Sequence, residues 1–165
     1  MPRESVPDDE RAFRAFLSPR GFDDGVMAVV FHLYRSTQEA IACAEAEVLR
    51  PIGLSWVAYV TLMGLWLLGS AEVRDLARMQ VASKPAVVKS LDGLERRRLV
   101  RRRRSKTDRR LVDVALTAAG RTLVRKIQRA IHEREHRLTG RLTVPEKRTL
   151  ARLLRKLDTS ASNGR

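Results

Sequence analysis

A metal-binding pattern is the first chemistry that this sequence offers. Residues 132–136 read HEREH, and on a helix His132 and His136 share one face with Glu133 nearby. Zinc hydrolases use such a pattern, with two imidazoles on the metal and the glutamate acting on its bound water. They also need a third protein ligand, and no further histidine follows His136. We therefore expect no enzyme, metal site or cofactor, and keep a zinc hydrolase as a less favoured alternative.

Positive charge is concentrated in one segment of the chain. The 165 residues include 33 Lys and Arg against 19 Asp and Glu, a formal charge of +14. Residues 96–110 alone carry nine arginines and one lysine against a single acid, Asp108. Guanidinium forks suit phosphate contacts and narrow minor grooves, and neutralised phosphates release counterions. This indicates a polyanionic partner, although the charge balance alone also fits RNA or an anionic membrane.

The apolar periodicity predicts a mainly α fold with a small β-hairpin. Steps of three and four residues indicate the following helices: 23–49, 55–68, 72–80, 83–97, 117–138 and 143–158. Alternation of period two predicts two strands, LVRRRR and LVDVALT, around the turn SKTDRR. Ser83 and Thr143 are expected N-caps, and a buried seam in residues 117–138 is expected to reach Leu138. Aromatic residues are only 5% of the chain, so the core must be mainly aliphatic.

The order of these elements predicts a winged helix-turn-helix domain between helices that dimerise. We expect an N-terminal arm over residues 1–22, a dimerisation helix over 23–53, a DNA-binding lobe over 54–117, C-terminal dimerisation helices over 118–158 and a disordered tail over 159–165. A docking helix and a disordered leader fit the arm equally well. The terminal helices carry apolar stripes that no sheet covers, which implies a second copy of the chain.

The span 54–127 resembles the MarR family of bacterial winged-helix transcription regulators. The resemblance lies in GLSWVAYVTL, in DLARMQVASKPAVVKSLDGLERRRLVRRRRSKTDRR and in VDVALTAAGRTLV. It implies a homodimer, most often a repressor, on a palindromic double-stranded DNA operator. It also implies a small, often aromatic, ligand that lowers DNA affinity. A zinc-responsive regulator that uses His132, Glu133 and His136 is a less favoured alternative within the family. Gln80 and Val81 depart from the usual turn, and Ala86 and Val88 from the usual polar outward positions, so no operator is predicted.

The resemblance also assigns the DNA contacts. In the major groove it places Ser83, Lys84, Pro85, Ala86, Val88 and Lys89. On the wing and the DNA backbone it places Arg101, Arg102, Arg103, Arg104, Lys106, Asp108, Arg109 and Arg110. Arg110 is expected to enter the minor groove, and Asp108 to hold the wing by pairing with a nearby arginine.

Remaining predictions concern the effector, the thiol and the compartment. His32, Trp56, Tyr59 and Met63 are candidates for an effector pocket, although the last three would equally suit a core. Cys43 is the only cysteine, which excludes an intrachain disulfide, and we expect it to be buried and unreactive. We see no signal peptide and no bilayer-length apolar run, and so expect a cytoplasmic protein. An architectural protein that binds DNA or RNA without an effector is the alternative function.

Overall fold

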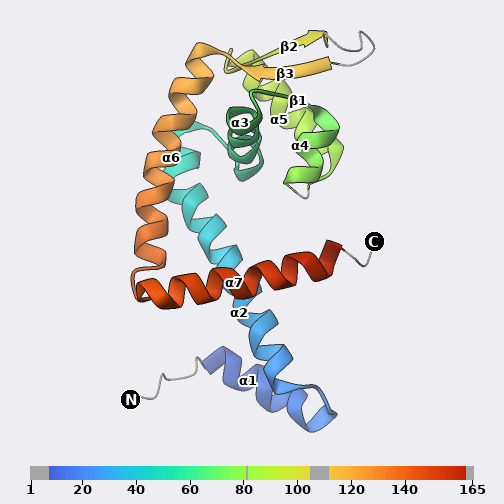
Figure 1. Cartoon of the computed structure of the whole chain (residues 1–165), viewed down its shortest axis with the longest axis vertical. Coiled ribbons are helices and arrows are strands. Elements are labelled where there is room, and N and C mark those ends of the chain that lie inside the picture. The colour runs from blue at the N-terminus through green and yellow to red at the C-terminus, as the bar shows by residue number, and fades with distance from the viewer. Residues whose placement is uncertain (1–7, 81, 105–111, 163–165) are drawn as a thin grey trace. The chain divides into compact units, whose positions relative to one another are not determined.

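The computed structural model describes residues 8–80, 82–104 and 112–162, mostly as helices with one small sheet (Figure 1). Side chains are described over 9–80, 82–103 and 113–157. The chain separates into two units, Met1–Cys43 and Ala44–Arg165. The mainly α architecture with a small β element confirms the fold class predicted from the sequence.

The first unit is a pair of helices. It contains α1 (Asp8–Leu17), a 3-10 turn (Ser18–Arg20) and α2 (Asp24–Ala44), whose last residue begins the second unit. Asp23 caps α2, because its Oδ1 accepts a hydrogen bond from the backbone N–H of Val26 at 2.8 Å. The sequence left a docking helix and a disordered leader as alternatives for the arm over residues 1–22. The described part of this arm contains the helix α1.

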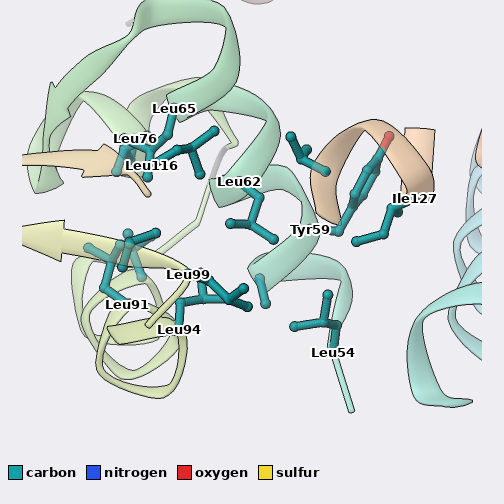
Figure 2. Close-up of a cluster of buried hydrophobic side chains, with 14 of the residues drawn as sticks. Leu54, Tyr59, Leu62, Leu65, Leu76, Leu91, Leu94, Leu99, Leu116 and Ile127 are labelled. Carbon is teal, nitrogen blue, oxygen red and sulfur yellow. The ribbon is translucent and has the colours of Figure 1, made fainter. Parts of the chain in front are cut away.

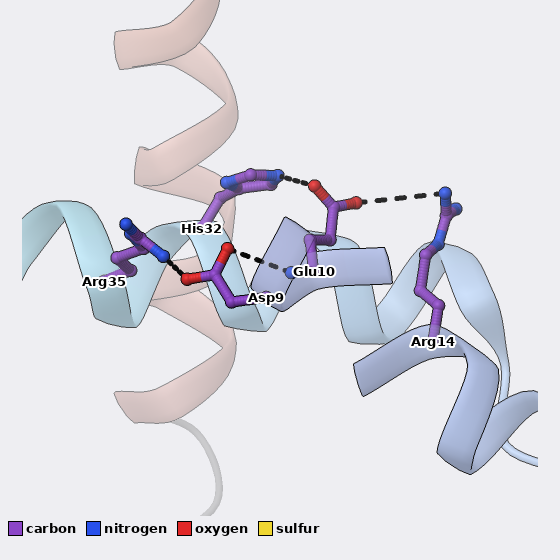
Figure 3. A network of polar contacts seen from close by, with 5 residues as sticks. All are labelled: Asp9, Glu10, Arg14, His32 and Arg35. Atoms are coloured by element: carbon purple, nitrogen blue, oxygen red, sulfur yellow. Dashed lines mark hydrogen bonds and ion pairs between the residues drawn. The ribbon is translucent and has the colours of Figure 1, made fainter. Parts of the chain in front are cut away.

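Polar contacts tie α1 to α2 within this unit (Figure 3). The Glu10 side chain is only 7% exposed, and its Oε2 lies 2.9 Å from Nε2 of His32. Its other oxygen lies 3.8 Å from the Arg14 guanidinium. Asp9 pairs with Arg35 on α2 and accepts a hydrogen bond from the backbone N–H of Glu10 at 3.0 Å. The buried carboxylate therefore has polar partners on both helices.

Much apolar surface remains exposed on this unit. The exposed side chains are Phe13, Phe16, Phe22, Val26, Val29, Val30, Leu33 and Tyr34. Several of them line a groove of about 930 Å³ between α1 and α2. Cys43 is partly exposed, so the prediction of a buried thiol is wrong for the single chain, because no described residue fully covers this face of α2.

The second unit is built around α3 (Trp56–Leu68), which is capped by Ser55 and apolar on most of its circumference. A π-helical turn (Glu45–Leu49) and a 3-10 turn (Arg50–Ile52) lead into it. Around it lie β1 (Ser70–Glu72), α4 (Val73–Met79), α5 (Lys84–Arg96), β2 (Val100–Arg104), β3 (Val112–Leu116) and α6 (Ala118–Leu138). The core they enclose is mainly aliphatic, with Tyr59 as an aromatic member (Figure 2). Leu62, Leu76 and Leu91 in it are 0% exposed.

The sheet is antiparallel, with the strands in the order β1-β3-β2. The β-hairpin was predicted from the sequence, but β1 was not, and α4 begins one residue later than expected. Only Ala71 of the three β1 residues is buried, so the strand is too short to show a period of two. Within β3, Val114 is 0% exposed and Asp113 is partly exposed, as the alternation predicts.

Thr117 and Gly120 join the sheet to α6. The Thr117 hydroxyl donates to the carbonyl of Arg98 at 2.8 Å, and its oxygen accepts from the N–H of Gly120 at 3.0 Å. A Cβ on Gly120 would lie 2.0 Å from the carbonyl oxygen of Leu99. This close approach of helix and backbone explains the glycine of the LTAAG stretch.

The last helices of the second unit keep an uncovered stripe. In α6, Val124, Ile127 and Ile131 are buried, but Leu138 is 53% exposed. Burial along the predicted seam therefore ends about two turns before Leu138, because no described element covers the end of α6. The final helix, α7 (Val144–Ser162), begins with the predicted capping box.

In that capping box, the backbone N–H and hydroxyl of Thr143 both donate to Oε2 of Glu146 at 2.7 Å. These hydrogen bonds hold the pKa of Glu146 below its ordinary value. Three α7 leucines on one face, Leu150, Leu153 and Leu157, are between 44% and 46% exposed.

No single helix of the described chain has both the length and the apolar character needed to cross a membrane. One bent pair, α2 with its following turns and α3, meets a test of length and composition when the two are taken together.

Candidate nucleic-acid interface

The start and orientation of α5 are fixed by its own sequence. Ser83 is extended and its hydroxyl oxygen accepts a hydrogen bond from the N–H of Ala86 at 3.4 Å, while Pro85 lies in the first turn. Val87 and Leu91 are 0% exposed. Since this apolar face is fully used by the core, the opposite face must point to solvent.

The outward face of α5 is the one that the sequence assigned to the major groove. Lys84, Pro85, Val88 and Lys89 are exposed, and Ala86 is partly exposed. Among the described residues, neither lysine has an ion pair. A cationic face with small apolar side chains between the lysines is thus free for a partner. Ser83, also exposed, has its oxygen engaged as the helix cap, which leaves its hydroxyl hydrogen as a donor.

The β2 strand places three arginines of known geometry next to α5. Arg101 and Arg103 are exposed, and neither has an ion pair within the described part of the chain. Arg102, between them, is held by Asp92 and Glu95 of α5 at 2.6 and 2.9 Å. The three arginines are therefore not equivalent, a difference that the run RRRR does not reveal.

The rest of the wing lies beyond what the structure describes. Lys106, Asp108, Arg109 and Arg110 fall outside the described residues, and of Arg104 only the backbone is described, as the last residue of β2. Their assigned contacts remain predictions from the sequence.

Two polar ties in the lobe were not predicted. Arg97, directly after α5, donates from its guanidinium to the carbonyls of Gly53 and Ile52, both at 3.0 Å. Gln80, which departs from the usual turn, donates from Nε2 to the hydroxyl of the buried Thr61 at 3.2 Å. The one sequence signal for the Gln80–Thr61 hydrogen bond was a threonine in an otherwise apolar helix.

The candidate effector residues fall in different surroundings. His32 belongs to the first unit and pairs with Glu10. Tyr59 is only 6% exposed, its hydroxyl donates to Oε1 of Gln128 at 2.6 Å, and its ring centroid lies 5.3 Å from that of Trp56. Burial, with a smaller contribution from the charge of Glu135, raises the pKa of Tyr59 to about 12.

Met63 lines a separate apolar hollow of about 410 Å³ in the second unit. Its other lining residues are Val60, Gly64, Trp66, Leu67 and Met79. Trp56 and Tyr59 do not contribute to this hollow, so Met63 is the one candidate of the second unit that does.

The HEREH histidines are exposed on α6, and their Nε2 atoms lie 3.2 Å apart. His132 also lies 3.4 Å from a carboxylate oxygen of Glu135. Within the described ranges, no group of three or more His, Cys, Asp and Glu side chains is arranged to hold a metal ion.

A helix-turn-helix formed by α4 and α5, followed by a hairpin with an outer basic strand, defines a winged helix-turn-helix protein. The family model described as the MarR family matches residues 54–112. An uncharacterised HTH-type transcriptional regulator of Bacillus subtilis, YwaE, is 32% identical over 131 residues, covering 79% of this chain and 77% of the relative. An HTH-type transcriptional repressor of Mycobacterium tuberculosis is 31% identical over 109 residues, covering 66% of this chain and 78% of the repressor.

Solved structures agree with this assignment. Bordetella bronchiseptica BpsR, whose DNA binding is described as regulated by 6-hydroxynicotinic acid, is similar with a TM-score of 0.71 and 25% identity, over 79% of this chain and 98% of that chain. A mutant of Escherichia coli MarR in complex with operator DNA gives a TM-score of 0.70 at 22% identity, over 81% of this chain and 96% of that one. The chain belongs to the MarR family, and it is a DNA-binding transcriptional regulator.

Proposed function

We propose that this chain represses transcription as a homodimer on a palindromic double-stranded operator, and that a small aromatic ligand lowers its affinity for the DNA. One observation carries the DNA-binding part of the proposal. The cationic outward face of α5 and the exposed Arg101 and Arg103 of β2 belong to neighbouring elements of one lobe. In a winged helix, the recognition helix enters the major groove while the hairpin follows the backbone.

The contacts divide by chemistry. Lys84 and Lys89 can donate to guanine edges, and Ala86 and Val88 can touch thymine methyl groups in the major groove. Arg101 and Arg103 would contact phosphates, which position the protein without reading sequence. From the sequence, Arg110 would enter the minor groove, and Arg104, Lys106 and Arg109 would add backbone contacts, with Asp108 holding the wing.

Exposed apolar faces on α1, α2 and α7 support the proposed dimer. Exposed leucines on α7 and exposed valines and aromatic residues on α2 and α1 form stripes that a lone chain leaves in water. Large exposed apolar patches mark interfaces in stable proteins, and a second copy is the simplest partner. Two lobes held in this way would present two α5 helices to one palindrome.

The effector is supported by resemblance and by the hollow that Met63 lines. BpsR, the similar structure with 25% identity, is described as regulated by a hydroxylated aromatic acid. An apolar hollow of about 410 Å³ with Trp66 and two methionines is of the kind that accepts a small aromatic compound. His32, Trp56 and Tyr59 remain candidates for the effector pocket from the sequence alone.

Selection of bound fragments from a genomic library tests the proposal. We expect one recovered palindrome that binds at least about 10³-fold more tightly than a random duplex at the same salt concentration. Lys89→Ala should reduce the preference for the palindrome over the random duplex, whereas Arg101→Ala should weaken binding to both duplexes by the same factor. Equal affinity of the wild-type protein for recovered and random duplexes would favour the architectural alternative instead.

A further inference from the structure

Arg102 bridges the hairpin and the recognition helix through three polar contacts. Its Nη2 lies 2.6 Å from Oδ1 of Asp92, and its Nη1 lies 2.9 Å from Oε2 of Glu95. Asp92 and Glu95 are three residues apart, so they share one face of α5. One guanidinium therefore bridges two carboxylates of the recognition helix from the hairpin.

The backbone of Arg102 takes part in the same interaction. Its N–H donates to Oε1 of Glu95 at 3.3 Å. This is possible because β2 is an outer strand of the sheet, paired with β3 on one side alone. Such an edge leaves N–H groups without a strand partner, and Glu95 supplies the acceptor. Glu95 thus holds the main chain of the wing as well as a side chain.

The neighbouring arginines provide the contrast. Side chains alternate along a strand, so Arg101 and Arg103 project from the face opposite to that of Arg102. Both are exposed, and neither is ion-paired among the described residues. The Arg102 side chain is 33% exposed and is committed to two anions. A phosphate could recruit it only by displacing carboxylates that lie within hydrogen-bond distance.

We propose that Arg102 is a positioning residue, which locks the wing to the recognition helix through Asp92 and Glu95, and that Arg101 and Arg103 make the phosphate contacts of β2. This departs from the phosphate contact that the sequence assigned to Arg102. It rests on the proposed function, in which α5 and the wing dock on one duplex. The lock sets the angle at which the wing reaches the backbone while α5 lies in the groove.

The salt dependence of DNA binding separates the two roles. The double variant Arg102→Gln/Glu95→Gln removes one positive and one negative charge, so the net charge is unchanged. We expect it to bind a random 30-base-pair duplex roughly tenfold more weakly, with the slope of log affinity against log salt unchanged. If Arg102 instead neutralised a phosphate in each lobe, its removal would reduce that slope by about 1.8.

For a matched control variant at Arg101 we expect the salt slope to change. Arg101→Gln/Glu133→Gln also keeps the net charge, with Glu133 lying on the exposed side of α6. We expect the slope to fall by about 1.8, because the variant dimer neutralises two fewer phosphates. If the Arg102 variant lowers the slope as much as this control does, Arg102 is a phosphate contact and the proposal is wrong.

Hydrogen exchange in the DNA-free protein tests the lock independently of function. Glu95→Ala should speed exchange of the Arg102 amide at least about tenfold, while the buried amides of α3 stay protected, which shows that the lobe is folded. Glu95→Gln, whose amide oxygen can still accept the hydrogen bond from the Arg102 N–H, should keep exchange of this amide slow. Unchanged exchange in Glu95→Ala would overturn the lock. Faster exchange without binding to any duplex would leave the lock standing and reject the proposed function.

Discussion

The helices α5 and α7 have similar apolar stripes but different surroundings. In α5, Val87, Leu91 and Leu94 are at most 1% exposed, because α3, α4 and the sheet enclose them. In α7, Leu150, Leu153 and Leu157 are 44% to 46% exposed. The apolar face of α5 is covered within one chain, whereas the described part of the chain does not cover the apolar face of α7. Periodicity therefore predicts a helix and its apolar side, but does not tell which chain covers that side.

Removal of a core leucine of α5 should have the largest effect on the lobe. Leu91→Ala leaves a cavity beneath the recognition helix, where Leu91 is 0% exposed. We expect the free energy of unfolding to fall by about 2–5 kcal/mol, measured by urea denaturation. A loss below about 1 kcal/mol would mean that α5 is not anchored as described.

A charge on the α7 stripe should act on association instead. Leu153→Asp puts a carboxylate on the exposed leucine face, so we expect the dissociation constant of the dimer to rise by about 100-fold or more. Sedimentation velocity measures it. The urea midpoint of the lobe, monitored through the fluorescence of Trp56 and Trp66, should stay unchanged. If Leu153→Asp remains as tightly dimeric as the wild type, the α7 stripe is not the interface.

Loss of the Tyr59 hydroxyl should have a smaller effect. Tyr59→Phe removes the 2.6 Å hydrogen bond to Gln128 of α6, so we expect a decrease of about 1 kcal/mol in the free energy of unfolding near neutral pH. Urea denaturation of the two proteins side by side measures this difference.

The same tyrosine predicts a pH dependence in alkaline solution. Folding raises the pKa of Tyr59 from its ordinary 10.0 to about 12, so the folded state keeps a proton that the unfolded state releases. Its contribution to stability is fully present below pH 10 and is lost as the pH rises through 12. Urea midpoints of wild type and Tyr59→Phe should therefore converge over this window. A constant difference between them would show that Tyr59 titrates normally.

The smallest expected effect concerns Arg98, which lies in the left-handed region with φ of 56°. A glycine adopts this conformation without strain. Arg98→Gly should therefore raise the free energy of unfolding by about 0.5–1 kcal/mol. Arg98→Ala, which keeps a Cβ, is the control and should give no such gain.

The sequence predicted what local patterns determine. The two predicted caps are confirmed: the Ser83 hydroxyl accepts a hydrogen bond from the N–H of Ala86, and Thr143 forms the capping box with Glu146. The inward face of α5 and the alternation of β3 were also correct. These features depend on residues within a turn or two of one another.

Features that depend on distant contacts were missed. β1 exists because three residues pair with β3, which no local pattern indicates. The difference between Arg102, which is ion-paired, and Arg101 and Arg103 depends on Asp92 and Glu95 of α5. Two acids three residues apart, directly before the basic segment 96–110, were the available signal. Exposure of Leu138 and partial exposure of Cys43 depend on which surfaces the rest of the molecule covers.

The central claim is that two lobes read one palindrome with their α5 helices in successive major grooves. Hydroxyl-radical footprinting of the recovered operator tests it most directly. We predict two symmetric protected half-sites with centres about 34–36 Å apart, one helical turn of DNA. A single protected half-site, or even protection along the whole duplex, would contradict the claim.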